Sequence, residues 1–97
     1  ILYKPSQRKN SKEAFRGFIN LFDDYLATDL FDNIKTPIQL IWGEKDPWES
    51  LDEAKEWHRK FKNIKRLDII KGAGHCPHDE DPKETNKLIC EFLQEIK

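Results

Sequence analysis

The sequence predicts an α/β fold in which a helix joins two parallel strands and further helices flank them. Two short β-rich runs, "IQLIW" (38–42) and "RLDII" (66–70), are each followed by a turn that contains glycine. The segments between and after these runs carry apolar residues three and four positions apart, which is the period of an amphipathic helix. A strand, a helix and a second strand in this order are typical of a parallel crossover unit.

The N-terminal third predicts a connection followed by a helix. Residues 1–10, with Pro5 and basic neighbours, are expected to form the connection. Ser11 is expected to be the N-cap of the helix, because its hydroxyl could accept a hydrogen bond from a free backbone N–H group. The predicted apolar stripe of this helix consists of Ala14, Phe15, Phe18, Ile19, Phe22, Tyr25 and Leu26.

The first strand and the helix after it have clear boundaries. Pro37 precedes the strand and Gly43 ends it. The sequence "SLDE" (50–53) has the form of a capping box, which predicts a helix from Ser50 to about Lys62. The apolar face of this helix would consist of Leu51, Ala54, Trp57 and Phe61.

The second strand ends at Lys71, and the last helix has a strong start signal. Asp81 is expected at the N-cap, Pro82 at the first helical position and Glu84 at the third. Asp79, Glu80 and Asp81, at the start of this helix, would complement the positive end of its dipole. The predicted core face consists of Leu88, Ile89, Phe92, Leu93 and Ile96.

Composition argues against several classes of partner. The 97 residues carry a formal net charge of −1, which gives no electrostatic reason to expect nucleic acid or an anionic membrane. No apolar run approaches the ~20 residues of a membrane-spanning helix. Cys76 and Cys90 are too few for a disulfide framework, so we expect reduced thiols and an intracellular compartment, cytoplasmic or plastid.

The predicted elements are too few to complete a sheet. An isolated pair of parallel strands is unfavourable and cannot bury itself. The sequence also contains no methionine, even at position 1. We therefore expect a C-terminal segment of a larger α/β protein, whose apolar sheet edge would make the isolated polypeptide aggregate or stay partly unfolded.

Candidate chemistry lies in the two loops that follow the strands. In open α/β sheets, ligands gather beyond the carboxyl ends of the strands, and parallel strands bring both loops to the same edge. The first loop (43–50) offers Asp46, and the second (71–81) offers His75. A carboxylate can fix the tautomer of a histidine and stabilise the imidazolium that forms when the histidine takes a proton. The pattern predicts an acid–base pair.

Simpler interpretations of these residues stay open. Asp46 in "KDP" could be an ordinary turn acid, and His75 a solvated loop histidine. A zinc site formed by His75, Cys76, His78 and Asp79 is a further alternative, although structural zinc usually takes ligands as spaced pairs. We expect no metal and no organic cofactor.

Two tryptophans flank the first loop. Trp42, at the end of the strand, is expected to pack in the core or at an interface. Trp48 could either pack in the same way or line a pocket for an apolar substrate.

The sequences of the two loops resemble a known family. "PIQLIWGEKDPWE" (37–49) together with "GAGHCPHDEDP" (72–82) resembles the C-terminal end of the α/β-hydrolase superfamily, and is closest in wording to the pheophytinase-like branch. The resemblance implies that Asp46 is the catalytic acid and His75 the general base. It also implies that residues 1–33 are the end of the cap or lid region with its connecting helix, and that residues 34–97 are the C-terminal βαβα part of the hydrolase core.

The resemblance implies an ester hydrolase whose nucleophile lies elsewhere. In this superfamily the order along the chain is serine, acid, histidine, and the chain contains no G-x-S-x-G motif. A serine upstream of Ile1 is therefore expected, and the segment alone is expected to be inactive. The implied partners are a small apolar ester and the remainder of the same polypeptide. Two alternatives are a non-catalytic binding protein with this fold and a dehalogenase-like hydrolase with an aspartate nucleophile.

Overall fold

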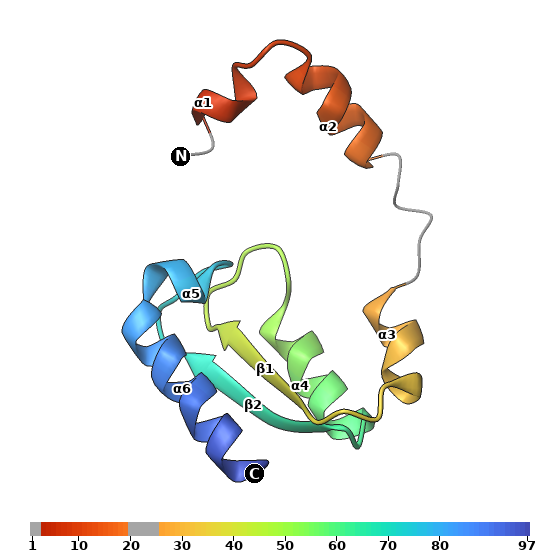
Figure 1. The fold of residues 1–97 in the computed structure, drawn as a ribbon, viewed down its shortest axis with the longest axis vertical. Helices are drawn as coiled ribbons and strands as arrows, with labels where there is room; N and C mark the ends of the chain where they lie inside the picture. Colours follow the sequence, from red (N-terminus) through yellow and green to blue (C-terminus); the bar gives the residue numbers. More distant parts are fainter. Residues whose placement is uncertain (1–2, 20–25) are drawn as a thin grey trace.

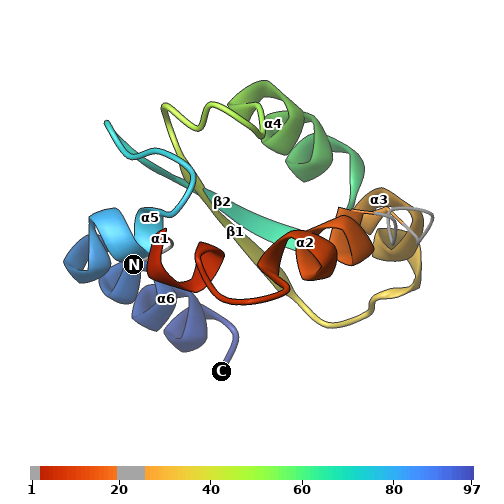
Figure 2. The same cartoon turned by 90° about the horizontal axis from the view of Figure 1, so that it is seen from above.

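A two-stranded parallel sheet lies at the centre of the computed structural model, which describes residues 3–19 and 26–97. Strand β1 (Ile38–Gly43) pairs with β2 (Ile64–Ile70), and helix α4 (Leu51–Lys60) connects them (Figure 1). Helix α6 (Pro82–Glu95) covers the face of the sheet opposite to α4 (Figure 2). The predicted α/β arrangement with parallel strands and flanking helices is confirmed.

The two faces of the sheet each carry a small apolar core, because side chains alternate along a strand. On the α4 side, Leu40 packs against a buried cluster of Phe31, Phe61 and Ile64. On the α6 side, Ile41 packs against a second cluster, which consists of Ile70, Ala73 and Leu88. Each helix is therefore held to its face of the sheet by its own set of buried side chains.

An irregularity near the start of β2 sets which side chains face which helix. Ile38 is paired with Ile64, but Gln39 is paired with Arg66, so Lys65 is an extra residue in β2. A bulge of this kind reverses the alternation at one point. As a result Ile64 packs in the cluster on the α4 side, whereas Arg66 faces α6.

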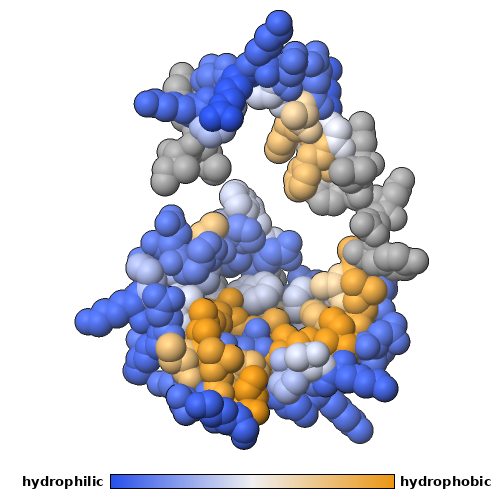
Figure 3. Space-filling model, in the orientation of Figure 1, coloured by the Kyte–Doolittle hydropathy of each residue, from blue (hydrophilic) through white to orange (hydrophobic). Residues whose placement is uncertain are grey.

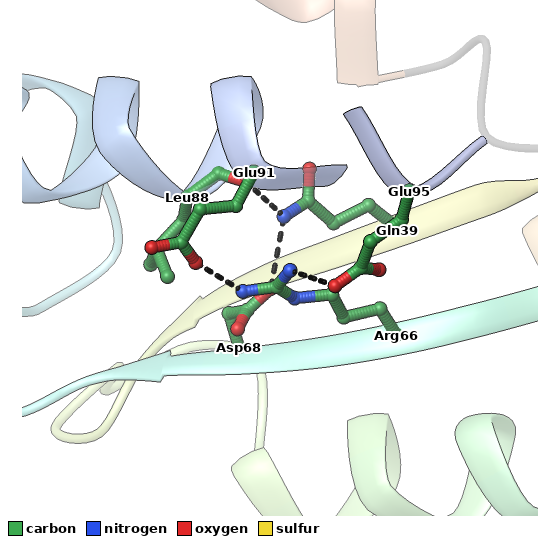
Figure 4. Close-up of polar contacts among 6 residues, drawn as sticks. All are labelled: Gln39, Arg66, Asp68, Leu88, Glu91 and Glu95. Atoms are coloured by element: carbon green, nitrogen blue, oxygen red, sulfur yellow. Dashed lines mark hydrogen bonds and ion pairs between the residues drawn. The ribbon is translucent and has the colours of Figure 1, made fainter. Parts of the chain in front are cut away.

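A polar cluster joins both strands to α6 (Figure 4). The Arg66 guanidinium donates to Asp68 at 2.7 Å, to Glu91 at 2.7 Å and to Glu95 at 2.8 Å. The hydrogen bonds to Asp68 and Glu91 raise the pKa of Arg66 above its ordinary value. The Gln39 amide donates to Asp68 at 2.8 Å and to the Leu88 carbonyl at 3.0 Å. These contacts fix the position of α6 on the sheet.

The helix starts agree in part with the sequence. Asp81 caps α6 as predicted, since its side chain accepts a hydrogen bond from the Glu84 N–H group at 3.1 Å. Ser50 caps α4 through the N–H of Asp52 at 3.2 Å, one residue earlier than the capping box requires. The short helix α5 (Pro77–Glu80) was not predicted, because four residues are too few to show a period.

The N-terminal prediction needs correction. Residues that were expected to form a connection include helix α1 (Tyr3–Ser6), and α2 (Ser11–Ile19) begins at Ser11 itself. Asn10 precedes α2 with a φ of 67°, and its carbonyl accepts from the Ala14 N–H group at 3.0 Å, so Asn10 and not Ser11 occupies the cap position. The rest of the helix predicted up to Leu26 falls largely on residues 20–25, outside the described residues. Helix α3 (Ala27–Leu30) and the 3₁₀ turn η1 (Phe31–Asn33) lead to β1.

Only two of the five residues of the predicted apolar face of α6 are buried. Leu88 and Phe92 lie in the interior, whereas Ile89, Leu93 and Ile96 are exposed. The described sheet has only two strands, and it does not extend far enough to cover these three residues. Figure 3 shows apolar side chains gathered on one face of the part that contains the sheet. Among the described residues, no helix has the length and apolar character needed to cross a membrane.

Candidate active site

The loops that follow β1 and β2 lie side by side at one edge of the sheet (Figure 1). The first loop is tied to the second by backbone hydrogen bonds. The Glu44 N–H donates to the Ile70 carbonyl at 3.0 Å, and the Lys45 N–H donates to the Ala73 carbonyl at 2.8 Å. The strand pairing ends at Gly43 and Ile70, and these two hydrogen bonds hold the loops together just beyond it.

Asp46 and His75 meet at this edge. The His75 Nδ1 atom lies 2.9 Å from the Asp46 Oδ2 atom. The Asp46 side chain is 5% exposed and that of His75 is 41% exposed. The acid is therefore shielded behind the imidazole, and the ring presents its other nitrogen away from the acid. The structure brings together the two residues that the sequence predicted as a pair.

The second oxygen of Asp46 organises its own loop. Oδ1 accepts hydrogen bonds from the Trp48 and Glu49 N–H groups, each at 2.9 Å. Burial raises the pKa of Asp46, but these two N–H groups and the His75 ring outweigh it, so the pKa of this carboxyl lies below its ordinary value. Asp46 is thus both a turn acid, through Oδ1, and the partner of His75, through Oδ2.

The lowered pKa of Asp46 predicts how its contribution to stability depends on pH. A carboxyl whose folded-state pKa is below its unfolded value of 3.8 stabilises the fold above that pH. This contribution is lost as the pH falls through the folded-state pKa. We expect the difference in free energy of unfolding between the wild type and Asp46→Asn to shrink below about pH 3.8. Urea unfolding of both proteins at a series of acidic pH values measures this difference. A difference that stays constant as the pH falls well below the ordinary pKa of an aspartate would contradict the lowered pKa of Asp46.

The two tryptophans of this region have different surroundings. The Trp42 Nε1–H donates to the Glu49 carbonyl at 3.0 Å, and its ring packs edge-on against Trp57 with centroids 5.8 Å apart, as expected for a packing residue. Trp48 is 75% exposed, and its ring lies edge-on to that of His75 with centroids 4.7 Å apart. Trp48 therefore borders the histidine instead of the core, and its contact with substrate stays a prediction.

The alternative zinc ligands do not converge. Within the part of the chain that the structure describes, no group of three or more histidine, cysteine, aspartate or glutamate side chains is arranged to hold a metal ion. The Nδ1 atom of His75 is engaged with Asp46. Cys76 is exposed beside it, and Cys90 is exposed on α6.

The sequence did not predict the role of three residues that shape this site. A Cβ atom added to Gly43 would lie 1.9 Å from the Gly74 carbonyl oxygen, so only glycine allows the two loops to approach this closely. The Glu44 carboxylate accepts from the Gly72 N–H at 3.1 Å, and the Glu80 carboxylate accepts from the Gly74 N–H at 2.7 Å. The only available signal was the glycine at the end of each strand. The glutamates gave none, because their partners are distant backbone amides.

Several curated proteins are similar to this chain. Monoacylglycerol lipase ABHD6 of Homo sapiens is 32% identical over 85 residues, which are 88% of this chain and 25% of the lipase. Epoxide hydrolase 4 of Homo sapiens is 37% identical over 62 residues, which are 64% of this chain and 17% of that protein. The chloroplastic pheophytinase of Arabidopsis thaliana is 30% identical over 76 residues, which are 78% of this chain and 15% of the pheophytinase.

These relatives define the family, although the chain spans a quarter or less of the length of each. No family model matches the chain, and no solved structure matches it significantly. The relatives are hydrolases of the α/β-hydrolase superfamily, and the parallel strands with their flanking helices are compatible with that fold. The similarity and the architecture together identify the chain as a C-terminal portion of an α/β-hydrolase superfamily protein, with pheophytinase among its relatives.

Proposed function

We propose that this chain supplies the acid, Asp46, and the general base, His75, of a hydrolase that acts on ester bonds. The observation that supports the proposal is the 2.9 Å contact between His75 Nδ1 and a shielded Asp46 carboxylate at the carboxyl edge of parallel strands. We further propose that residues 34–97 belong to the hydrolase core and residues 1–33 to the end of its cap. The nucleophilic serine would come from the remainder of the polypeptide.

The proposed mechanism assigns one task to each nitrogen of His75. Nδ1–H donates to Asp46 Oδ2, which leaves Nε2 as the acceptor of a proton. Nε2 takes the serine hydroxyl proton as the serine oxygen attacks the ester carbonyl, and passes it to the departing alkoxide. The resulting acyl-serine is hydrolysed by water, which Nε2 deprotonates in turn before returning that proton to the serine. The Asp46 carboxylate stabilises the imidazolium in both steps.

Two observations support an apolar substrate. The exposed Trp48 ring borders His75 and offers an apolar wall beside the reacting groups. The names of two relatives specify a monoacylglycerol lipase and a pheophytinase. We propose a small ester with an apolar acyl or alcohol part.

A second candidate follows from the epoxide hydrolases among the relatives. In a hydrolase with an aspartate nucleophile, His75 would activate the water that cleaves the covalent ester intermediate. Asp46 would hold the same tautomer. This candidate differs from the first in its nucleophile, an aspartate instead of a serine, and in its substrate, an epoxide instead of an ester. A non-catalytic binding protein with the same scaffold would need neither nucleophile.

A chemical probe of the full-length protein distinguishes these candidates. A fluorophosphonate reacts with a serine only when a base activates its hydroxyl. We expect covalent labelling of the wild type and its loss in His75→Ala. Absence of labelling, with ¹⁸O from labelled water appearing in an aspartate after a single turnover, would support the second candidate instead. If neither fluorophosphonate labelling nor ¹⁸O incorporation is seen, the protein is a non-catalytic binding protein.

A further inference from the structure

The backbone just before His75 is held by a side chain of α5. The Glu80 Oε2 atom accepts a hydrogen bond from the Gly74 N–H group at 2.7 Å. Gly74 is the residue that immediately precedes His75. A carboxylate bound to a backbone N–H makes a shorter and stronger hydrogen bond than a neutral acceptor does.

Space around Gly74 is limited on two sides. A Cβ atom added to Gly74 would lie 3.2 Å from Glu80 Oε2 and 3.4 Å from Oε1, so a larger residue here would require the Glu80 carboxylate to move by a few tenths of an ångström. The Gly74 carbonyl in turn lies against Gly43, at the end of β1, where an added Cβ would be 1.9 Å away. Gly74 is therefore confined between β1 and Glu80.

The helix that carries Glu80 is itself anchored. The Thr85 hydroxyl of α6 donates to the Pro77 carbonyl at 3.1 Å, and Thr85 is only 4% exposed. The Glu80 N–H donates to the Cys76 carbonyl at 3.0 Å, and the Asp81 N–H donates to the Pro77 carbonyl at 2.8 Å. These bonds fix the backbone of Glu80 relative to α6, which the polar cluster fixes to the sheet.

We propose that Glu80 is a positioning residue for His75: its carboxylate holds the Gly74 amide and thereby fixes where the imidazole leaves the loop and meets Asp46. The inference rests on the function proposed above, because it concerns the same base. Glu80 is exposed at the surface, so its effect is one of geometry instead of charge. It touches neither the reacting atoms nor the ring of His75 and acts through the backbone.

The test compares four variants of the full-length protein with p-nitrophenyl butyrate as the ester. Glu80→Ala removes the acceptor, Glu80→Gln keeps an acceptor oxygen without the charge, and His75→Ala removes the base. Asp79→Ala is the matched control, because it removes a neighbouring acid of α5 whose side chain makes no hydrogen bond within the described part of the chain. We expect Glu80→Ala to lower kcat about tenfold to a hundredfold with little change in KM, since small displacements of a catalytic group have effects of this size.

The control and the conservative variant separate positioning from general stability. We expect Glu80→Gln to retain kcat within about threefold, and Asp79→Ala to match the wild type. Deuterium exchange of the peptide spanning residues 71–76 should be faster in Glu80→Ala than in Asp79→Ala, because the Gly74 amide loses its acceptor. Where Glu80→Ala does not fold, Glu80→Ser takes its place in both measurements, because a serine side chain is too short to reach the Gly74 amide.

The outcomes also separate this inference from the proposed function. If His75→Ala abolishes turnover but Glu80→Ala keeps the kcat and the exchange rate of Asp79→Ala, the role of Glu80 is overturned and the hydrolase function stands. If Glu80→Gln is as slow as Glu80→Ala although its exchange is unchanged, positioning by this hydrogen bond is also overturned. If the wild type and His75→Ala turn over at equal rates, the proposed function fails, and the exchange measurement alone decides whether Glu80 holds the loop.

Discussion

Replacement of His75 by alanine in the full-length protein is expected to lower kcat for ester hydrolysis by about 10⁴-fold, the typical loss when one member of such a triad is removed. The physical reason is that this variant removes the proposed proton acceptor, the imidazole that lies 2.9 Å from Asp46 Oδ2. Without the imidazole, the serine proton must pass to water. Steady-state kinetics with a p-nitrophenyl ester measures the effect.

The partner and a surface histidine provide the controls for this result. Asp46→Asn keeps the size of the side chain but favours the wrong tautomer of His75, so its loss should approach that of His75→Ala. The double variant should be scarcely slower than either single one, because the two residues act as a unit. His58→Ala, on the exposed surface of α4, should retain full activity. A turnover within tenfold of the wild type for His75→Ala would refute the assignment of the base.

Replacement of Gly43 by alanine is expected to have the second largest effect. The new Cβ would lie 1.9 Å from the Gly74 carbonyl oxygen, 2.5 Å from that of Ala73 and 2.8 Å from the Ala73 carbonyl carbon. All three atoms are backbone, so relief requires the two loops to separate. Overpacking of this kind typically costs about 1–3 kcal/mol in free energy of unfolding. Separation also moves His75 away from Asp46, which should lower kcat by about 10²-fold.

A second glycine provides the matched control for Gly43. A Cβ atom added to Gly17, in the exposed middle of α2, meets no atom within 4 Å. Gly17→Ala should therefore stabilise the protein by about 0.5–1 kcal/mol, as expected for a helix interior, and leave kcat unchanged. Urea unfolding and ester hydrolysis of both variants test the comparison. A Gly43→Ala protein with wild-type stability and turnover would show that the loops are not in close contact.

The sequence alone was sufficient to predict the strands, α4 and α6, and the proximity of Asp46 to His75. The decisive features were local: β-rich runs bounded by glycine, and the Asp81–Pro82 start of α6. The meeting of the two loops followed from one topological rule, since parallel strands direct both carboxyl ends to the same edge. That the pair is catalytic was implied by the family resemblance and stays a proposal.

Other features depend on contacts between distant segments, which no local pattern records. Helix α5 has four residues, barely more than one helical turn, so no repeat of an apolar pattern could reveal it and Glu80 could be predicted only as an acid near the start of α6. The extra residue Lys65 in β2 depends on the pairing of two strands. Arg66 finds its partners on α6, 25 and 29 residues away. The exposed Ile89, Leu93 and Ile96 fit an amphipathic helix by period, but the period does not say which neighbours are present.

The contact between Asp46 and His75 also has a consequence for chain entropy. The two residues are 29 positions apart, and the segment between them consists of α4 and β2 with their turns. Closing a flexible loop of this length costs about 3 kcal/mol. The same closure is already required for β2 to pair with β1, because the last strand pair, Gly43 with Ile70, lies only a few residues before Asp46 and His75. Bringing the acid and the base together therefore adds almost no loop-closure cost beyond that of forming the crossover unit itself.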